Sequence, residues 1–236
     1  MNHNTLRQKL SAGVVSFPVT TFKPDLPLDL EGYRANLRFI IKHPVCSVVA
    51  AAGTGELYSL SPAEHRAVVQ ATVEEVKGRV PVIAGTGFNH PIAVELAKHS
   101  AAVGADGILA LPPYYPNADE DGLFEYYKAI ADATPLGLLI YSRDWVNPGP
   151  AIVERLAQLP AMLTWTGGQA DLRPYQALHQ HLAHRLPASA AFAPAACRHP
   201  HVLLSVARLA GPGAQRVAYF AVLHRHVARD FVGQQH

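Results

Sequence analysis

The chain has 236 residues, 49% of them hydrophobic and 16% charged, which excludes a disordered chain and leaves room for one large domain or two small ones. No apolar run reaches the roughly 18 residues of a membrane span, and the N-terminal MNHNTLRQKL lacks the apolar core of a signal peptide, so the sequence predicts neither. The formal net charge is +2, and the eight Arg of residues 155–236 are dispersed without interleaved aromatic residues, which argues against a nucleic-acid-binding surface.

Short apolar segments alternate along the chain with longer amphipathic ones. The short segments end mostly at Gly, Pro or a polar residue, as buried parallel strands do, and they cover residues 13–20, 46–53, 79–87, 104–113, 136–142 and 162–166. The longer segments have the periodicity of helices that pack one face on a sheet, and they cover residues 28–43, 61–78, 90–104, 118–133 and 149–159. Ser61, followed by Pro62 and Glu64, predicts a capped start for the second of these helices.

The spacing of these segments predicts the fold class. Six β-α units in one run predict a parallel sheet covered by helices. Two more units would complete a (β/α)8 TIM barrel: residues 201–209 supply one strand, residues 217–232 its helix, and residues 189–193 are the candidate for the other strand. Because such barrels typically take about 250 residues, we expect one α/β domain over residues 1–236 that is clipped or irregular around strand 7.

A Rossmann-like sheet is the alternative fold. Neither GTGELY at residues 53–58 nor GTGFNH at residues 85–90 matches the GxGxxG fingerprint of a dinucleotide site. The acidic residue that such a site requires also has no evident position. The barrel is therefore the fold that the sequence favours.

Histidines and cysteines raise the question of a metal. On a helix His181 and His184 would share a face, whereas His179 would not. Zinc sites usually pair such ligands with an acid, and residues 155–236 contain only two acidic residues. We therefore expect solvated histidines and no metal. The two cysteines lie far apart at 46 and 197, which fits a reduced, cytoplasmic protein.

The carboxyl ends of the strands are where a TIM barrel carries its function. After the second strand, Gly53, Thr54 and Gly55 form a tight loop. Glycine lets a ligand approach the backbone closely, and amides with a hydroxyl can hold a carboxylate or a phosphate. The same pattern also fits an ordinary strand-to-helix turn, and spacing alone does not separate the two.

The fifth strand suggests a second candidate. Tyr141 lies at its end and Arg143 two residues on, so the two side chains share one side of an extended segment. A phenol can relay a proton, and a guanidinium can hold a carboxylate through two hydrogen bonds. The alternative is a tyrosine packed at the barrel rim beside a solvated arginine.

Together these segments resemble the dihydrodipicolinate synthase/N-acetylneuraminate lyase superfamily. The resemblance rests on SFPVTTF, AAGTGELYSLSPAEH, PVIAGTG, GADGILALPPYY, PLGLLIYSRD and GGQADLR. It covers residues 10–178 and is degenerate over residues 180–236. The LPPYY and YSRD segments are most similar to the 5-dehydro-4-deoxyglucarate dehydratase-like branch.

The resemblance implies a TIM barrel, a dimer or tetramer, that acts on 2-keto acids without a metal or an organic cofactor. It implies that Thr54, with the amides of Gly53 and Gly55, holds the carboxylate of the keto acid. It further implies that Tyr141 relays the proton and that Tyr115 from a neighbouring subunit completes the relay.

At the position of the family's Schiff-base lysine this chain has a threonine. The family's sixth strand ends in a pattern like F/W-K-D-G, and the matching stretch here places Thr166 on the lysine and Gly167 on the acid. A hydroxyl cannot form an imine with a keto group. Arg143 would steer the distal, acidic end of the substrate.

The sequence thus predicts a keto-acid lyase of class I aldolase lineage, which dehydrates an acidic sugar derivative with or without decarboxylation. Without the lysine, enolisation at Tyr141 is the route that remains. One alternative is a non-catalytic homologue or partner subunit that binds a keto acid or carboxylate. Another is a decayed or mis-sequenced copy, altered after residue 155. The expected partners are a small-molecule keto acid or sugar acid and further copies of the chain.

Overall fold

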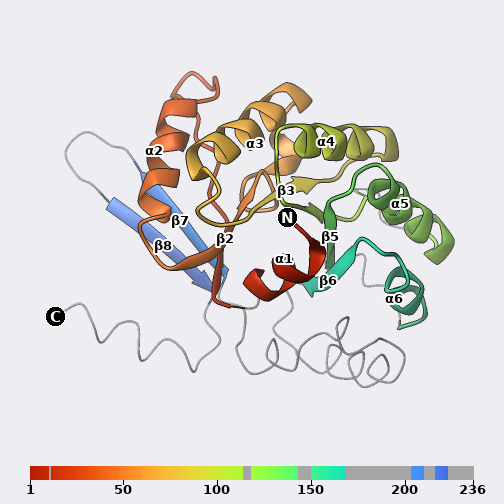
Figure 1. Cartoon of the computed structure of the whole chain (residues 1–236). Helices are drawn as coiled ribbons and strands as arrows, with labels where there is room; N and C mark the ends of the chain where they lie inside the picture. The colour runs from red at the N-terminus through yellow and green to blue at the C-terminus, as the bar shows by residue number, and fades with distance from the viewer. Residues whose placement is uncertain (11, 114–117, 143–149, 168–202, 210–215, 223–236) are drawn as a thin grey trace.

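A computed structural model describes the chain apart from residues 11, 114–117, 143–149, 168–202, 210–215 and 223–236 (Figure 1). Within these residues the helices are α1 (His3–Leu10), α2 (Leu30–Ile40), α3 (Pro62–Val76), α4 (His90–Ala102), α5 (Glu120–Asp132) and α6 (Pro150–Leu156), together with the 3-10 turn η1 (Leu57–Ser59). The strands are β1 (Val14–Ser16), β2 (Val45–Ala50), β3 (Val82–Thr86), β4 (Gly107–Ala110), β5 (Gly137–Ser142), β6 (Met162–Gly167), β7 (Leu203–Leu209) and β8 (Arg216–Val222). In this part of the chain no helix is long and apolar enough to cross a membrane.

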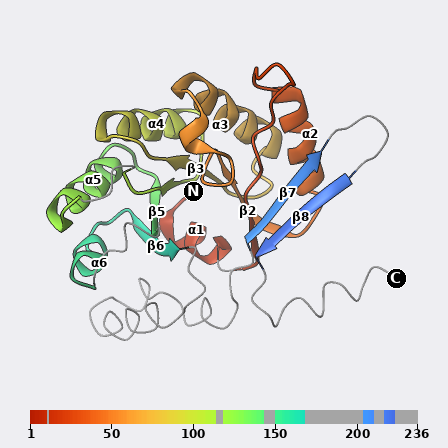
Figure 2. The same ribbon diagram turned by 180° about the vertical axis from the view of Figure 1, so that it is seen from behind.

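The strands form one sheet in the order β6-β5-β4-β3-β2-β1-β7-β8. Neighbours from β6 to β7 pair in parallel, and β8 pairs with β7 in antiparallel fashion. Figures 1 and 2 show that β1 to β6 curl into a half-barrel with α2 to α6 on its outside. The sequential order of β1 to β6 confirms the predicted β-α units and contradicts the Rossmann-like alternative, whose strand order reverses at a switch point.

Side chains of β2 to β6 alternate between two hydrophobic cores. The outer core, between the sheet and the helices, includes Val48 and Ile140. The inner core includes their neighbours Val49 and Leu139, together with Leu109 of β4. Because both faces of these strands are buried, they need nearly continuous apolar sequence, which is why they could be predicted as short apolar runs.

Helix α1 covers the N-terminal ends of the strands and was not predicted from the sequence. Leu6 is fully buried in the inner core. The Arg7 guanidinium donates through Nε to the Leu163 carbonyl at 3.3 Å. The His3 ring bonds through Nε2 to the carbonyl of Pro135, just before β5, at 3.0 Å. Helix α1 therefore joins β5 and β6 at the end of the half-barrel opposite to the carboxyl ends of the strands.

The C-terminal strands correct one prediction and confirm another. The strand expected at residues 201–209 is present as β7 and pairs in parallel with β1. Residues 216–222 form β8 and do not begin the helix expected over 217–232; they pair with β7 along their whole length, from Leu209↔Arg216 to Leu203↔Val222. The candidate strand at 189–193 lies outside the described residues.

Helix α3 begins with the predicted cap. The Ser61 hydroxyl accepts a hydrogen bond from the Glu64 N–H at 3.3 Å, and the Glu64 carboxylate accepts one from the Ser61 N–H at 2.9 Å. The Ser61 hydroxyl also donates to the Glu64 carboxylate at 2.7 Å, and together with the Ser61 N–H it holds the pKa of that carboxyl below its ordinary value. Such a cap contributes about 1 kcal/mol to helix stability.

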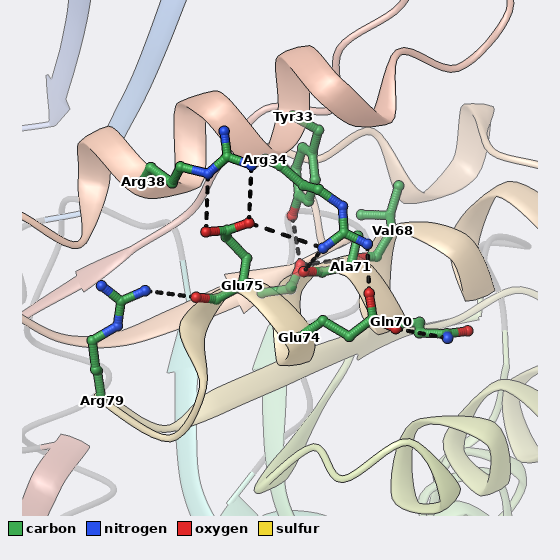
Figure 3. A network of polar contacts seen from close by, with 10 residues as sticks. Tyr33, Arg34, Arg38, Val68, Gln70, Ala71, Glu74, Glu75 and Arg79 are labelled. Atoms are coloured by element: carbon green, nitrogen blue, oxygen red, sulfur yellow. Dashed lines mark hydrogen bonds and ion pairs between the residues drawn. The ribbon is translucent and has the colours of Figure 1, made fainter.

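Polar contacts join α2 to α3 on the outside of the half-barrel (Figure 3). The Glu75 carboxylate lies between two guanidinium groups of α2, at 3.1 Å from Arg38 Nε and 4.0 Å from Arg34 Nη1. Beneath them the buried hydroxyls of Tyr33 and Thr72 share a hydrogen bond of 2.9 Å. The ion pairs at the surface and the buried hydrogen bond together hold α2 against α3.

Candidate functional site

The residues that follow β2 form a tight loop at the carboxyl edge of the sheet. The Glu56 N–H donates to the Gly53 carbonyl at 3.2 Å, and the Leu57 N–H donates to the Ala52 carbonyl at 3.1 Å. Glu56 and Ala51 have positive φ angles of 58° and 47°, a left-handed conformation that is unfavourable for residues with a Cβ. Backbone strain of this kind tends to occur where a protein binds a ligand.

The loop is packed on one side and open on the other. Gly55 is buried, and a Cβ at its position would lie 3.0 Å from the Ala51 Cα. Gly53 is exposed, and no described atom lies within 4 Å of where its Cβ would be. Thr54 is half-buried between them. The backbone at Gly53 is therefore open to approach, while the carboxylate-binding role of this loop stays a prediction.

Two neighbouring strand ends hold the loop from beneath. Thr20, in the segment after β1, is buried, and its Oγ1 donates to the Gly55 carbonyl at 2.7 Å. On the other side, β3 approaches so closely that a Cβ on Gly85 would lie 2.2 Å from the Ala51 carbonyl oxygen. The buried ring of His65 bonds through Nε2 to the Gly85 carbonyl at 2.7 Å. Burial lowers the pKa of His65 to about 4, so the ring is neutral at pH 7.

Tyr141, near the end of β5, packs against the inner core. Phe17, Tyr58 and Phe88 also pack there, each from a segment at the carboxyl end of a strand. Tyr58 and Phe88 are in edge contact with ring centroids 5.3 Å apart, and the Tyr58 hydroxyl donates to the Pro112 carbonyl at 2.7 Å. Tyr141 therefore packs toward the inside of the curl, and its role as proton relay stays a prediction.

The sequence analysis singled out Tyr141 and missed the other three aromatic residues. Each of them follows a strand by only a few positions, which is the signal that could have found them. Together with Tyr141 they pack against the inner core at this edge of the sheet.

The backbone of β6 places Thr166 next to Tyr141. The two residues are register partners, as are Ser142 and Gly167. Tyr115 and Arg143 lie outside the described residues, so their expected roles stay predictions. The end of β6 thus lies beside the end of β5 that carries Tyr141, and the assignment of position 166 to the family's lysine stays a prediction.

The described part of the chain holds no group of three or more His, Cys, Asp or Glu side chains that could bind a metal ion. The histidines at 179–184 and 199–201 lie outside it. Because β1 to β6 are parallel, the ends of β2, β5 and β6 share one edge of the sheet. That edge carries amides and a hydroxyl suited to a carboxylate, a phenol suited to proton transfer, and a threonine at position 166.

Residues 10–187 match the model of the dihydrodipicolinate synthetase family. The chain is 39% identical over 187 residues to a probable 5-dehydro-4-deoxyglucarate dehydratase of Bradyrhizobium diazoefficiens, and the alignment covers 79% of this chain and 60% of the relative. It is 44% identical over 161 residues to a protein of the same description from Streptomyces griseus, with 68% and 50% covered. The chain thus spans between half and 60% of the length of these relatives.

Solved structures of dihydrodipicolinate synthases are also similar to this chain. Dihydrodipicolinate synthase from Bacillus clausii superposes with a TM-score of 0.71 at 27% identity, over 78% of this chain and 61% of that one. The chloride-inhibited dihydrodipicolinate synthase of Acinetobacter baumannii, complexed with pyruvate, superposes with a TM-score of 0.69 at 32% identity, over 72% and 60%. Both comparisons agree with the resemblance inferred from the sequence motifs.

Proposed function

The chain belongs to the dihydrodipicolinate synthetase family, and from this premise we propose that it binds a 2-keto acid or sugar acid at the carboxyl ends of β2, β5 and β6. The proposed reaction class is that of a keto-acid lyase similar to 5-dehydro-4-deoxyglucarate dehydratase: dehydration of an acidic sugar derivative, with or without decarboxylation. The observation that carries the proposal is the loop after β2, which exposes its backbone at the sheet edge that Tyr141 shares.

Recognition begins with the carboxylate next to the keto group. In the proposal, the Thr54 hydroxyl and the amides of Gly53 and Gly55 donate to its oxygens. The absence of a side chain at Gly53 lets the anion reach the backbone, and the strained turn keeps the loop in one conformation. Arg143 would hold a second carboxylate through two hydrogen bonds, which selects diacids over monoacids.

Proton transfer is the task of Tyr141. Dehydration removes a proton from the carbon beside the carbonyl group, and hydroxide leaves the next carbon and takes up a proton to become water. Tyr141 would relay this proton at the edge where Phe17, Tyr58 and Phe88 also pack against the inner core. Tyr115 of a neighbouring subunit would complete the relay, in a cytoplasmic dimer or tetramer. We further propose that residues 1–236 form one TIM-barrel domain that is clipped or irregular around strand 7, and that no metal or organic cofactor takes part.

Thr166 would prevent covalent catalysis through an imine without preventing the binding of a keto acid. A hydroxyl cannot form an imine, so turnover would have to proceed by enolisation at Tyr141 without a covalent intermediate. The same observation favours a second candidate function, in which the chain is a non-catalytic homologue or partner subunit that binds a keto acid.

Two measurements on one sample distinguish these functions. Calorimetric titration with pyruvate and with 5-dehydro-4-deoxyglucarate measures binding, and mass spectrometry follows the loss of water from the second acid. A lyase should bind it and consume it, and Tyr141→Phe should abolish consumption while binding persists. Binding without consumption would support the non-catalytic function. If neither acid binds, both candidate functions are wrong.

Thr166→Lys tests the assignment of the lysine position. Borohydride reduces an imine to a stable amine, so a protein that forms an imine with pyruvate gains mass when both reagents are present. The parent keeps its six lysines and should gain none, whereas Thr166→Lys should gain one pyruvate adduct. If the folded variant forms no adduct at saturating pyruvate, position 166 does not face the keto group.

A further inference from the structure

We propose that Thr20 is a positioning residue, which fixes the loop after β2 in the orientation that receives a carboxylate. The inference rests on the proposed function, because it assigns a task to a residue behind that binding loop. Thr20 lies 35 positions from Gly55 in sequence, within the SFPVTTF segment of residues 16–22, and none of the roles expected from the sequence was assigned to it.

The contact is buried and directional. The Thr20 side chain is 7% exposed, and its hydroxyl donates to the Gly55 carbonyl at 2.7 Å. Gly55 packs closely against the residues after β2, since a Cβ at its position would lie 3.0 to 3.2 Å from backbone atoms of Ala51 and Ala52. Thr20 therefore determines which way the Gly55 carbonyl points.

One peptide unit transmits this orientation to the open side of the loop. The Gly55 carbonyl and the Glu56 N–H belong to the same planar peptide, so they point in opposite directions. The carbonyl is held by Thr20, and the N–H donates to the Gly53 carbonyl at 3.2 Å. These two hydrogen bonds, one from Thr20 to Gly55 and one from Glu56 to Gly53, thus fix both ends of the segment whose amides would hold the carboxylate.

A threonine at the end of β3 offers a matched control. Thr86 is also buried, and its Oγ1 also donates to a main-chain carbonyl, that of Ala93 in α4, at 2.8 Å. Removing the Thr86 hydroxyl deletes the same kind of hydrogen bond without touching the loop after β2. A comparison of the two sites therefore separates the effect on the loop from a general loss of stability.

The test uses Thr20→Val, Thr20→Ser and Thr86→Val in the full chain. Hydrogen exchange without ligand should show that Thr20→Val lowers the protection of the Glu56 and Leu57 amides at least about fivefold, because a buried carbonyl has lost its donor. Calorimetry should show that pyruvate binds Thr20→Val about five- to tenfold more weakly than the parent. Thr20→Ser, which keeps the hydroxyl, and Thr86→Val should match the parent in both measurements.

The two readouts can fail separately. If the parent binds pyruvate and Thr20→Val binds it equally well, the inference is overturned although the proposed function stands. If the parent binds no keto acid, the proposed function fails, and hydrogen exchange still decides whether Thr20 orients the loop. Equal protection of the Glu56 and Leu57 amides in Thr20→Val and Thr86→Val would show that Thr20 does not orient the loop. If Thr20→Val does not fold, Thr20→Ala replaces it, with the same expectations.

Discussion

His65 should make the stability of the fold depend on pH between about 4 and 6.5. Its side chain is fully buried on α3, and the ring bonds through Nε2 to the Gly85 carbonyl at 2.7 Å. Burial lowers the pKa of the ring from 6.5 to about 4; the hydrogen bond to Gly85 acts in the opposite direction, and the charges of His99 and Arg66 lower the pKa further. At pH 7 the His65 ring of the folded protein is therefore neutral, and no charge is buried there.

The size of the effect follows from the difference between the two pKa values. In the unfolded chain the ring takes up a proton as the pH falls through about 6.5, whereas in the folded protein it does so only near 4. The unfolded state therefore binds more protons in this window, so the free energy of unfolding decreases as the pH is lowered. Between pH 7 and 4 the loss is about 3 kcal/mol, a large part of the 5–15 kcal/mol by which domains are usually stable.

Urea unfolding at several pH values, for the parent and for His65→Gln, measures this contribution. Glutamine does not titrate, and its amide can still donate to the Gly85 carbonyl. The parent should lose about 2 kcal/mol more stability than the variant between pH 7 and pH 4.5. His99→Gln should change the slope less, because the lowered pKa of His99 belongs to a half-buried ring. The same pH dependence in the parent and in His65→Gln would refute the reasoning.

Three further predictions concern packing and charge. Leu6→Ala should lower the free energy of unfolding in urea by about 2–5 kcal/mol, because it opens a cavity in the inner core, and a loss below about 1 kcal/mol would mean that α1 contributes little there. Gly85→Ala should lower the thermal midpoint, because the new Cβ would lie 2.2 Å from a backbone oxygen, whereas Gly53→Ala should leave it unchanged; equal midpoints would contradict the packing described at the loop. A double-mutant cycle on Arg38 and Glu75 should give a coupling of about 0.2–1 kcal/mol that decreases at about 1 M salt, and a salt-independent coupling would argue against a screened ion pair.

The N-terminal helix shows where a sequence pattern stops being informative. Within MNHNTLRQKL only Leu6 and Leu10 are large and apolar besides the initial methionine, too few to define a helical face. Both become buried because the half-barrel leaves an apolar end that α1 covers. The reason for the helix thus lies in residues far along the chain, such as Leu163, whose carbonyl accepts from Arg7.

The strand β8 illustrates a different failure. Its residues, RVAYFAV, read equally well as a buried helical face or as a strand, since a short apolar run lacks a clear period. The aromatic and β-branched residues Val217, Tyr219, Phe220 and Val222 favour a strand. Pairing with β7 decides the matter, and that pairing is a tertiary contact that local sequence does not specify.

Alternation along β5 explains where Tyr141 packs, because the side chains of a strand point to opposite faces in turn and Leu139, two positions earlier, is in the inner core. No comparable rule leads to Thr20. Its partner Gly55 belongs to another β-α unit, and a hydroxyl that bonds to a main-chain carbonyl leaves no mark in the sequence of either segment. The alternation within one strand was thus within reach of sequence reasoning, whereas contacts between different β-α units were not.

Recognition and covalent chemistry come from different strands in the proposed site. The loop after β2 is held by Thr20 from the β1 side and by the close approach of Gly85 from the β3 side, and none of these contacts involves β6. Thr166 on β6 is coupled to the site through its register with Tyr141 on β5. A change at position 166 can therefore remove imine formation and leave the carboxylate loop undisturbed. The same geometry supports a lyase that works by proton transfer and a protein that only binds, and only the fate of the bound acid separates the two.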